Sequence, residues 1–236
     1  TIEETDNDTI ILQANELEQK VKYKSMPVLP VDGHLNLHKG VYNRIVQQYM
    51  IKKPLSFRLV TSCDVPPGSG LGTSSTMVVA ILKAFTEWLN LPLGDYDMAR
   101  LAYEIERKDL GLSGGKQDQY AATFGGFNFI EFHDNDMVIV NPLRIKRWII
   151  DELEVSMVLF YTGDSRSSDK IIREQQENTA HGKKLSVEAT HNIKKNSFVM
   201  KDLLLKGEIV QFCKALGKDW ENKKNMASSI TNKNID

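Results

Sequence analysis

The sequence has few cysteines, and their placement excludes a disulfide or zinc framework. Cys63 and Cys213 lie far apart, without CxxC spacing and without other ligand residues beside them. A small disulfide-rich or zinc-stabilised domain carries more cysteines at closer spacing. We therefore expect each cysteine to be a buried free thiol, which is typical of a protein from a reducing compartment.

The sequence also lacks an excess of charge of either sign and a long apolar run. Thirty Lys and Arg residues stand against 31 Asp and Glu residues, which gives a formal net charge of −1. Proteins that bind nucleic acid by neutralising many phosphates carry an excess of positive charge. The longest apolar run, 77–82, is far shorter than the roughly 20 residues of a membrane helix, and no secretory signal opens the chain. We therefore expect a cytoplasmic protein whose partners are neither nucleic acid nor a membrane.

What is present is a chain of ordinary globular composition, with 236 residues, 41% of them hydrophobic and 26% charged. At roughly 150 residues per domain, this length predicts one or two domains, and we place a boundary near residue 150. The first strong helical periodicity lies at 37–50, and Asp95 is the expected N-cap of a later helix. Periodicity predicts further helices over 73–89, 96–108, 119–124 and 168–205 and strands over 55–63, 127–132, 137–140 and 155–162.

Glycine is concentrated in the middle of the chain. Nine of the 15 glycines lie between Gly68 and Gly126, and only four follow. Glycine serves backbone conformations that other residues avoid, and binding residues lie disproportionately in loops. We therefore expect the functional site in this part of the chain.

The first glycine-rich segment, 68–75, has the features of a phosphate cradle. It joins a predicted strand to a predicted helix, so that backbone N–H groups and the positive helix end can both face an anion. The hydroxyls of residues 73–75 can donate to phosphate or complete a magnesium shell. The loop is neither a Walker A sequence nor G-x-G-x-x-G, because its spacing is G-x-G-x-G. The alternative is a purely structural turn.

Two carboxylates flank the second glycine-rich segment, 111–117. Glu106 lies in the last turn of a predicted helix, where the helix dipole disfavours a carboxylate, so a magnesium ion would give it a role. The alternative is a solvated charge. Asp118 begins a helix, either as a simple N-cap or as the group that orients an attacking hydroxyl or accepts its proton. His34 and His38 have the spacing of zinc ligands, but no further His or Cys ligand is close in sequence, and we expect no zinc site.

These segments resemble the GHMP family of small-molecule kinases. The run Pro66-Pro67-Gly68-Ser69-Gly70-Leu71-Gly72-Thr73-Ser74-Ser75 is similar to the family signature Pro-x-x-x-Gly-Leu-Gly-Ser-Ser-Ala. It departs from the signature at Thr73, which replaces Ser, and at Ser75, which replaces Ala. The segments 101–107, 114–128 and 141–145 are similar to the branch that contains D-glycero-D-manno-heptose 7-phosphate kinase.

The resemblance implies an α+β fold of two domains. These are a ribosomal protein S5 domain 2-like ATP-binding domain over 1–150 and an incomplete ferredoxin-like domain over 151–236. It also implies an ATP-dependent kinase that transfers the γ-phosphoryl group to a sugar hydroxyl. The anomeric hydroxyl of D-glycero-D-manno-heptose 7-phosphate is the first candidate. Fucose or galactose kinases and a non-catalytic nucleotide- or sugar-binding relative are the alternatives, and a homodimer is the candidate oligomeric state.

Carried over residue by residue, the resemblance also implies a site. The ATP phosphates would be wrapped by Pro67, Gly68, Ser69, Gly70, Leu71, Gly72, Thr73 and Ser74. Ser74 and Glu106 would hold Mg²⁺, Asp118 would face the substrate hydroxyl, and the sugar would contact Gly114, Gly115, Lys116 and Gln117. Family members also carry a strand and a glycine-rich segment that would precede Thr1, and a third glycine motif near their C-terminus. Because this sequence shows neither, we expect that the chain by itself does not turn over substrate.

Overall fold

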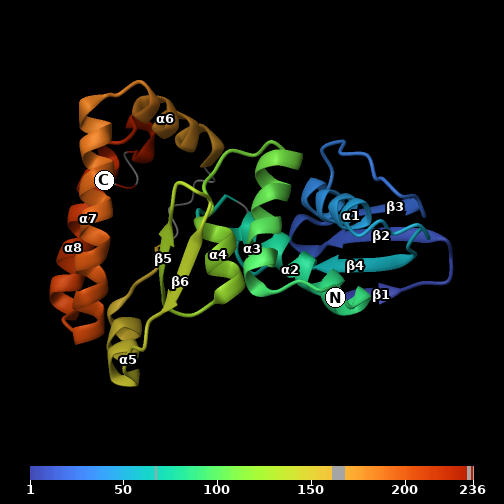
Figure 1. Ribbon diagram of the computed structural model, residues 1–236, viewed down its shortest axis with the longest axis horizontal. Helices are drawn as coiled ribbons and strands as arrows, with labels where there is room; N and C mark the ends of the chain where they lie inside the picture. Colours follow the sequence, from blue (N-terminus) through green and yellow to red (C-terminus); the bar gives the residue numbers. More distant parts are fainter. Residues whose placement is uncertain (67, 161–167, 233–234, 236) are drawn as a thin grey trace. The chain divides into compact units, whose positions relative to one another are not determined.

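The computed structural model describes residues 1–66, 68–160, 168–232 and 235, and divides the chain into two compact units (Figure 1). Unit 1 is Thr1–Gly125 and unit 2 is Gly126–Asp236. The division between the units therefore lies before residue 150, where a domain boundary was predicted, but compact units do not test which family domains the ranges 1–150 and 151–236 form. That domain assignment stays a prediction.

Unit 1 contains a four-stranded sheet that the sequence had indicated only in part. Its strands are β1 (Ile2–Glu4), β2 (Thr9–Ala14), β3 (Gln19–Lys24) and β4 (Phe57–Thr61), in the order β1-β4-β2-β3. The central strands β2 and β4 run parallel, with Leu12 opposite Leu59, and the other two pairings are antiparallel. The predicted strand at 55–63 is confirmed as β4, but the three strands before residue 25 were not predicted.

The helices of unit 1 follow the predicted periodicity closely. They are α1 (Asn36–Gln48), α2 (Thr73–Leu89), α3 (Asp95–Glu104) and α4 (Gln117–Phe124). Two expectations are corrected. Gly94 precedes α3 without a side-chain cap and Asp95 is its first residue. The helix predicted to reach residue 108 instead changes at residue 105 into a π-helical turn, η2 (Ile105–Asp109).

The core of unit 1 fills the space between the sheet and helices α1, α2 and α3 (Figure 1). Alternate residues of β2 and β4 are buried, as a half-buried strand requires. The aromatic rings at its centre pack at centroid distances of 5.3 to 5.5 Å, with Phe57 between Tyr42 and Phe85. Because β4 and α2 both contribute to this core, the core fixes the two elements that the glycine-rich loop connects.

Unit 2 pairs one hairpin with helices. The hairpin is β5 (Asn128–Phe132) with β6 (Val138–Pro142), and the helices are α5 (Arg147–Ser156), α6 (Ser168–Ala180), α7 (Lys184–Lys206) and α8 (Ile209–Lys224). The strand predicted over 155–162 is wrong in its described part. Residues 155–156 end α5, residues 157–160 form no strand, and residues 161–162 lie outside the described residues. A strand needs a partner to bond with, and this apolar run has none among the described residues.

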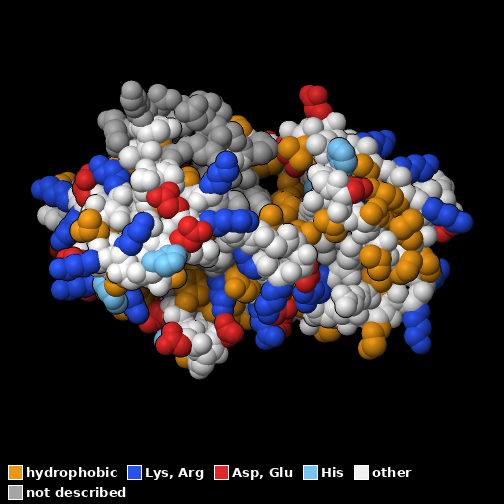
Figure 2. All heavy atoms as spheres, turned by 90° about the horizontal axis from the view of Figure 1, so that it is seen from above, with side chains coloured by type: hydrophobic (Ala, Val, Ile, Leu, Met, Phe, Trp, Pro, Cys, Tyr) orange, Lys and Arg blue, Asp and Glu red, His pale blue; other side chains and the backbone are white. Residues whose placement is uncertain are grey.

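The surface corrects one further expectation. Cys213 is exposed and Cys63 is half-buried, although both are free thiols. Lys and Arg side chains are interspersed with Asp and Glu over the face in Figure 2 rather than gathered in one basic patch. In the part of the chain that the structure describes, no helix is long and apolar enough to cross a bilayer. The mixed helix and strand content confirms the α+β class.

Candidate active site

The loop between β4 and α2 has the backbone conformation that its glycines predict. Gly68, Gly70 and Gly72 have φ values of +77°, +79° and +70°, in the left-handed region that side-chain-bearing residues avoid. Gly72 directly precedes α2. The first backbone hydrogen bond of this helix is donated by Thr76 N–H to the Gly72 carbonyl oxygen at 3.0 Å. Pro67, which was predicted to belong to the loop, lies outside the described residues.

The start of α2 offers donors to an anion. The first N–H groups of a helix have no partner within it, and the helix dipole places positive charge there. Thr73, Ser74 and Ser75 form this first turn, with Ser74 exposed and Ser75 buried. Open amide groups beside hydroxyls at a seventeen-residue helix are suited to hold phosphate oxygens.

Glu106 lies beneath this turn and is 1% exposed. The Ser74 hydroxyl donates to Glu106 Oε1 at 2.8 Å, and the Ser75 hydroxyl donates to Oε2 at 2.7 Å. The amide nitrogen of Gln119 donates to Oε2 as well. Glu106 is part of the π-helical turn η2, a rare type of turn that occurs frequently at functional sites. The solvated charge considered as its alternative is therefore excluded.

The second glycine-rich segment is held beside Glu106 by Arg107. The Arg107 guanidinium lies 3.9 Å from Glu106 Oε1 and donates to the Gly115 carbonyl at 3.3 Å. A Cβ on Gly114 would collide with the same guanidinium, so a larger residue at this position would displace the end of the Arg107 side chain. Lys116 Nζ lies 5.2 Å above the ring of Tyr103. The residues predicted to contact the sugar therefore sit next to the candidate metal ligand.

Asp118 lies against the glycine-rich loop. It is an exposed residue in the first turn of α4. A Cβ built on Gly72 would be 3.3 Å from Asp118 Cγ, which shows how closely the carboxylate approaches the loop backbone. Its position beside the loop and in solvent suits a group that contacts a substrate hydroxyl.

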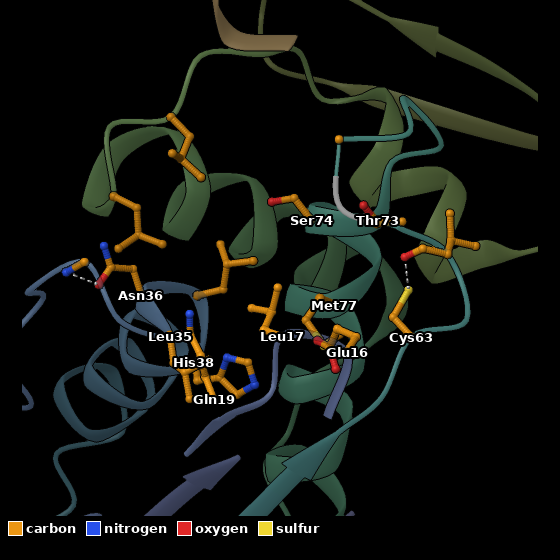
Figure 3. Close-up of a pocket in the computed structure, with 16 residues that line it drawn as sticks. Glu16, Leu17, Gln19, Leu35, Asn36, His38, Cys63, Thr73, Ser74 and Met77 are labelled. Carbon is orange, nitrogen blue, oxygen red and sulfur yellow. Dashed lines mark hydrogen bonds between the residues drawn. The ribbon is translucent and has the colours of Figure 1, made fainter. Parts of the chain in front are cut away.

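A cavity of about 410 Å³ opens beside the loop within unit 1 (Figure 3). Its walls are mainly apolar. They come from the connection between β2 and β3, the start of α1 and the residues just before it, the segments that follow β4 and η2, and the first turns of α2. Leu17, Leu35, Asn36, His38, Cys63 and Met77 line it, with Thr73 and Ser74 at the loop side. The sequence analysis did not predict this cavity, because its walls come from segments that are distant in sequence.

His38 is the buried polar group of this cavity wall. It is 3% exposed, and its Nε2 pairs with Thr61 Oγ1 at 2.9 Å. Burial lowers the pKa of His38 from 6.5 to about 4. His34 is exposed, so the two histidines do not share an environment. No group of three or more His, Cys, Asp or Glu residues that could hold a metal ion is found within the described ranges.

The pair formed by Ser74 and Glu106 fits a magnesium ion. Both residues present oxygen atoms, the donor type that Mg²⁺ prefers. Two protein ligands are few, but Mg²⁺ in phosphoryl-transfer sites is bound by one or two side chains together with substrate phosphates. The fit therefore depends on the phosphate cradle, to which Ser74 itself belongs.

The structure thus brings together Gly72, Ser74, Glu106 and Asp118, which were predicted from segments far apart in sequence. Gln119 was missed as a site residue, although its place beside Asp118 at the start of a helix could have indicated it. Ser75 was noted only as a third hydroxyl of the loop, whereas its hydroxyl turns inward to Glu106.

Comparisons with known proteins identify relatives of this chain. Residues 36–126 match the family model of the GHMP kinases N terminal domain. Over all of its 236 residues the chain is 48% identical to D-glycero-alpha-D-manno-heptose 7-phosphate kinase from Campylobacter jejuni, of which it covers 69%.

Solved structures give the same result. The crystal structure of a D-glycero-D-manno-heptose 1-phosphate kinase from Bacteroides thetaiotaomicron matches 95% of this chain, with 56% identity and a TM-score of 0.82, and this chain spans 66% of it. A Lactococcus lactis galactokinase, only 15% identical, shares the fold with a TM-score of 0.69. With a relative that is 48% identical across the whole chain and with the loop and carboxylates in place, the chain belongs to the GHMP kinase family.

Proposed function

We propose that the protein is an ATP-dependent sugar-phosphate kinase whose acceptor is the anomeric hydroxyl of D-glycero-D-manno-heptose 7-phosphate. The observation that carries this proposal is the convergence of the phosphate cradle, the Ser74–Glu106 pair and Asp118 at one end of α2. The identity of 48% to a heptose 7-phosphate kinase supports the choice of substrate. The reaction would take place in the cytoplasm, where ATP and sugar phosphates are available.

The donor would bind with its phosphates on the loop and its base in the cavity. The backbone N–H groups of residues 68–74 and the start of α2 supply donors to the phosphate oxygens. The neighbouring cavity of about 410 Å³ has apolar walls with few polar groups, as sites for flat organic ligands do. Its position directly beside Thr73 and Ser74 matches the short distance between the base and the phosphates of a nucleotide.

Ser74 and Glu106 would hold Mg²⁺ against the phosphates. The ion would neutralise the charge that develops on the transferred group. Asp118 would orient the sugar hydroxyl and accept its proton as the hydroxyl oxygen bonds to the γ-phosphorus of ATP, while the bond between that phosphorus and the bridging oxygen breaks and ADP leaves. Phosphoryl transfer with a loose transition state depends mainly on such positioning. The loop of Gly114, Gly115, Lys116 and Gln117 would contact the sugar next to Asp118.

Two alternatives are less well supported. An L-fucokinase/L-fucose-1-P guanylyltransferase from Bacteroides fragilis is 27% identical over 170 residues, far below the heptose kinase. A non-catalytic relative that only binds nucleotide or sugar would not need Ser74, Glu106 and Asp118 to converge. The names of the two heptose kinases differ in the position of the phosphate already present on the substrate, and the acceptor hydroxyl has to be determined directly.

Phosphorus NMR of the full-length protein with Mg-ATP tests the proposal. Heptose 7-phosphate should give a new signal from an anomeric phosphate, and heptose 1-phosphate, fucose and galactose should give none. Asp118→Asn should lower kcat at least about 100-fold, the usual contribution of such a group. Because Asp118 is exposed, the Tm of the Asp118→Asn variant should equal that of the parent protein. Transfer to fucose or galactose would reassign the substrate, and the absence of transfer to all four sugars would overturn the proposal. Light scattering of the same sample would test the candidate homodimer.

A further inference from the structure

We propose that Ser75 and Gln119 are positioning residues, which turn the Glu106 carboxylate so that a single oxygen faces the metal. This inference rests on the proposed function, because it concerns the ligand of the proposed Mg²⁺. Neither residue was assigned a role by the family resemblance. Both are almost completely buried, with exposed fractions of 2% for Ser75 and 0% for Gln119.

The two oxygens of Glu106 have different surroundings. Oε2 faces the interior and accepts from the Ser75 hydroxyl at 2.7 Å and from the Gln119 amide nitrogen. Oε1 faces the site and accepts from the exposed Ser74 hydroxyl at 2.8 Å. A carboxylate with one oxygen committed to two buried donors presents the other oxygen to a ligand. Glu106 therefore presents Oε1 beside Ser74, which is the arrangement of a one-oxygen ligand.

The three side chains on the interior side form a closed set of hydrogen bonds. Gln119 Nε2 donates to Ser75 Oγ at 3.0 Å and also to Glu106. A carboxylate can only accept, so the Gln119 amide has to turn its nitrogen toward Glu106. Buried hydrogen bonds to a charged group are stronger than those in solvent, and their loss leaves the charge without a partner. The set therefore restricts the rotation of the Glu106 side chain.

This set also joins the metal ligand to the group that contacts the hydroxyl. Ser75 belongs to α2, Glu106 to η2 and Gln119 to α4. Gln119 directly follows Asp118, so the same helical turn places one side chain inward on Glu106 and the other outward beside Gly72. A change at Gln119 should consequently alter metal binding more than it alters the binding of the sugar.

Binding of Mn²⁺, used as the probe for Mg²⁺, tests this inference by electron paramagnetic resonance in the presence of a non-hydrolysable ATP analogue. The variants are Ser75→Ala and Gln119→Met in the full-length protein. The loss of an outer partner of a metal ligand typically weakens binding 10- to 100-fold. We expect this range for Gln119→Met and its lower end for Ser75→Ala. Ser75→Ala restores the residue of the family signature and should fold.

Two further variants complete the comparison. Thr86→Val removes another buried α2 hydroxyl, which bonds to the Leu82 carbonyl at 2.8 Å and is remote from Glu106, and Mn²⁺ affinity should be unchanged. Glu106→Gln should abolish the signal of protein-bound Mn²⁺ and leave that of free Mn²⁺. In rate measurements, the Mg²⁺ concentration for half-maximal activity should rise in both test variants, with the KM for the sugar unchanged.

The outcomes distinguish a failure of the positioning role alone from a failure of the proposed metal site. Weaker Mn²⁺ binding in Ser75→Ala, with Thr86→Val like the parent, supports the positioning role even if Gln119→Met does not fold. Affinities within twofold of the parent in the folded variants overturn it, whatever their Tm, and assign these residues to structure alone. If the parent protein binds no Mn²⁺, the proposed metal site fails, and the positioning role fails with it.

Discussion

Gly70 and Gly72 share a backbone conformation but differ in what surrounds them. Both have positive φ, +79° and +70°, so that alanine at either position adopts a strained conformation. A Cβ on Gly70 would meet no atom within 4 Å, whereas a Cβ on Gly72 would lie 3.3 Å from Asp118 Cγ. The two glycines therefore separate the effect of backbone strain from the effect of displacing Asp118.

We predict that Gly70→Ala and Gly72→Ala lower the free energy of unfolding by similar amounts, about 1–2 kcal/mol. Gly72→Ala should in addition lower kcat at least about 10-fold relative to Gly70→Ala, because Asp118 has to move, and small misplacements are costly in catalysis. Urea titrations and steady-state rates measure the two effects. Equal kcat values in the two variants would show that Asp118 does not act from this position.

His38 makes the stability of the protein depend on pH. Burial lowers the pKa of His38 from 6.5 to about 4, so that between these values the unfolded chain binds a proton that the folded chain does not. The free energy of unfolding should therefore fall as the pH drops from 6.5 toward 4, with a slope of at most about 1.4 kcal/mol per pH unit.

His38→Gln should remove this part of the pH dependence, since glutamine does not titrate. His34→Gln is the matched control. Because His34 is exposed, this substitution should leave the slope unchanged. Urea unfolding at pH 7.5, 6.5 and 5.5 measures how the free energy of unfolding of each variant changes with pH. A slope in His38→Gln that equals that of the parent would mean that His38 is protonated normally in the folded state.

At the scale of elements, the π-helical turn η2 is held at both ends by one residue of α1. Arg44 Nε donates to Asp109 Oδ2 at 2.7 Å, and Arg44 NH1 donates to Glu104 Oε2 at 3.2 Å. Leu110, which follows the turn, lies against Gly40, where a Cβ would be 3.0 Å from its side chain. Because Glu106 belongs to this turn, α1 fixes the backbone that carries the candidate metal ligand.

We predict that Arg44→Met lowers the free energy of unfolding by about 2 kcal/mol, because two partly buried carboxylates lose a charged donor. Hydrogen exchange of the Leu110 and Leu112 amides, which bond to carbonyls of η2, should become faster. Arg100→Met is the control, since Arg100 contacts the same Glu104 from the surface and should cost at most about 0.5 kcal/mol. Unchanged exchange in Arg44→Met would show that η2 holds its shape without this clamp.

Among the elements, the sequence predicted those whose pattern is complete within one segment. Helices α1 and α2 and strand β4 each carry enough periodic apolar residues to be recognised. In β2 the apolar Ile11 stands between the buried Ile10 and Leu12 and hides the alternation, and this strand is defined by its pairing with β4 across more than 40 residues. Strand β3 has only two hydrophobic residues, Val21 and Tyr23. The opposite error was made at residues 155–160, where a strand was predicted and none is present. The apolar run suggested a strand, but the sequence does not show whether a partner strand lies beside it.

The residues of the candidate site could also be predicted only where a single segment of the sequence carries their signal. The glycine-rich loop, Glu106 and Asp118 stand in recognisable segments, so the resemblance to a family signature placed them in advance. The roles of Ser75 and Gln119 could not be predicted, because they depend on which of two adjacent residues in a helical turn faces the interior. The cavity depends on walls from the β2–β3 connection, α1, the segment after β4 and α2 together, and it has no local signature.

At the scale of the whole chain, the two units have unequal cores. Unit 1 contains a continuous cluster of twenty buried hydrophobic residues, whereas the corresponding cluster of unit 2 is Ile149, Leu153, Leu204 and Ile209. Unit 2 also exposes an apolar run, with Val155, Leu159 and Phe160 each more than 80% exposed. Burial of apolar surface is the main favourable term in folding, so unit 1 should hold most of the stability of the chain.

We therefore predict that residues 1–125 fold alone, with a single cooperative urea transition, and that residues 126–236 alone do not. Chymotrypsin, which cleaves after large apolar residues, should cut this chain first near Leu159 and Phe160 and leave a resistant fragment ending close to Gly125. The fragment carries the loop, the cavity, Glu106 and Asp118 on a complete core, so an ATP analogue should raise its Tm. A fragment that unfolds without cooperativity would contradict the prediction and would mean that unit 1 needs contacts from outside its own 125 residues.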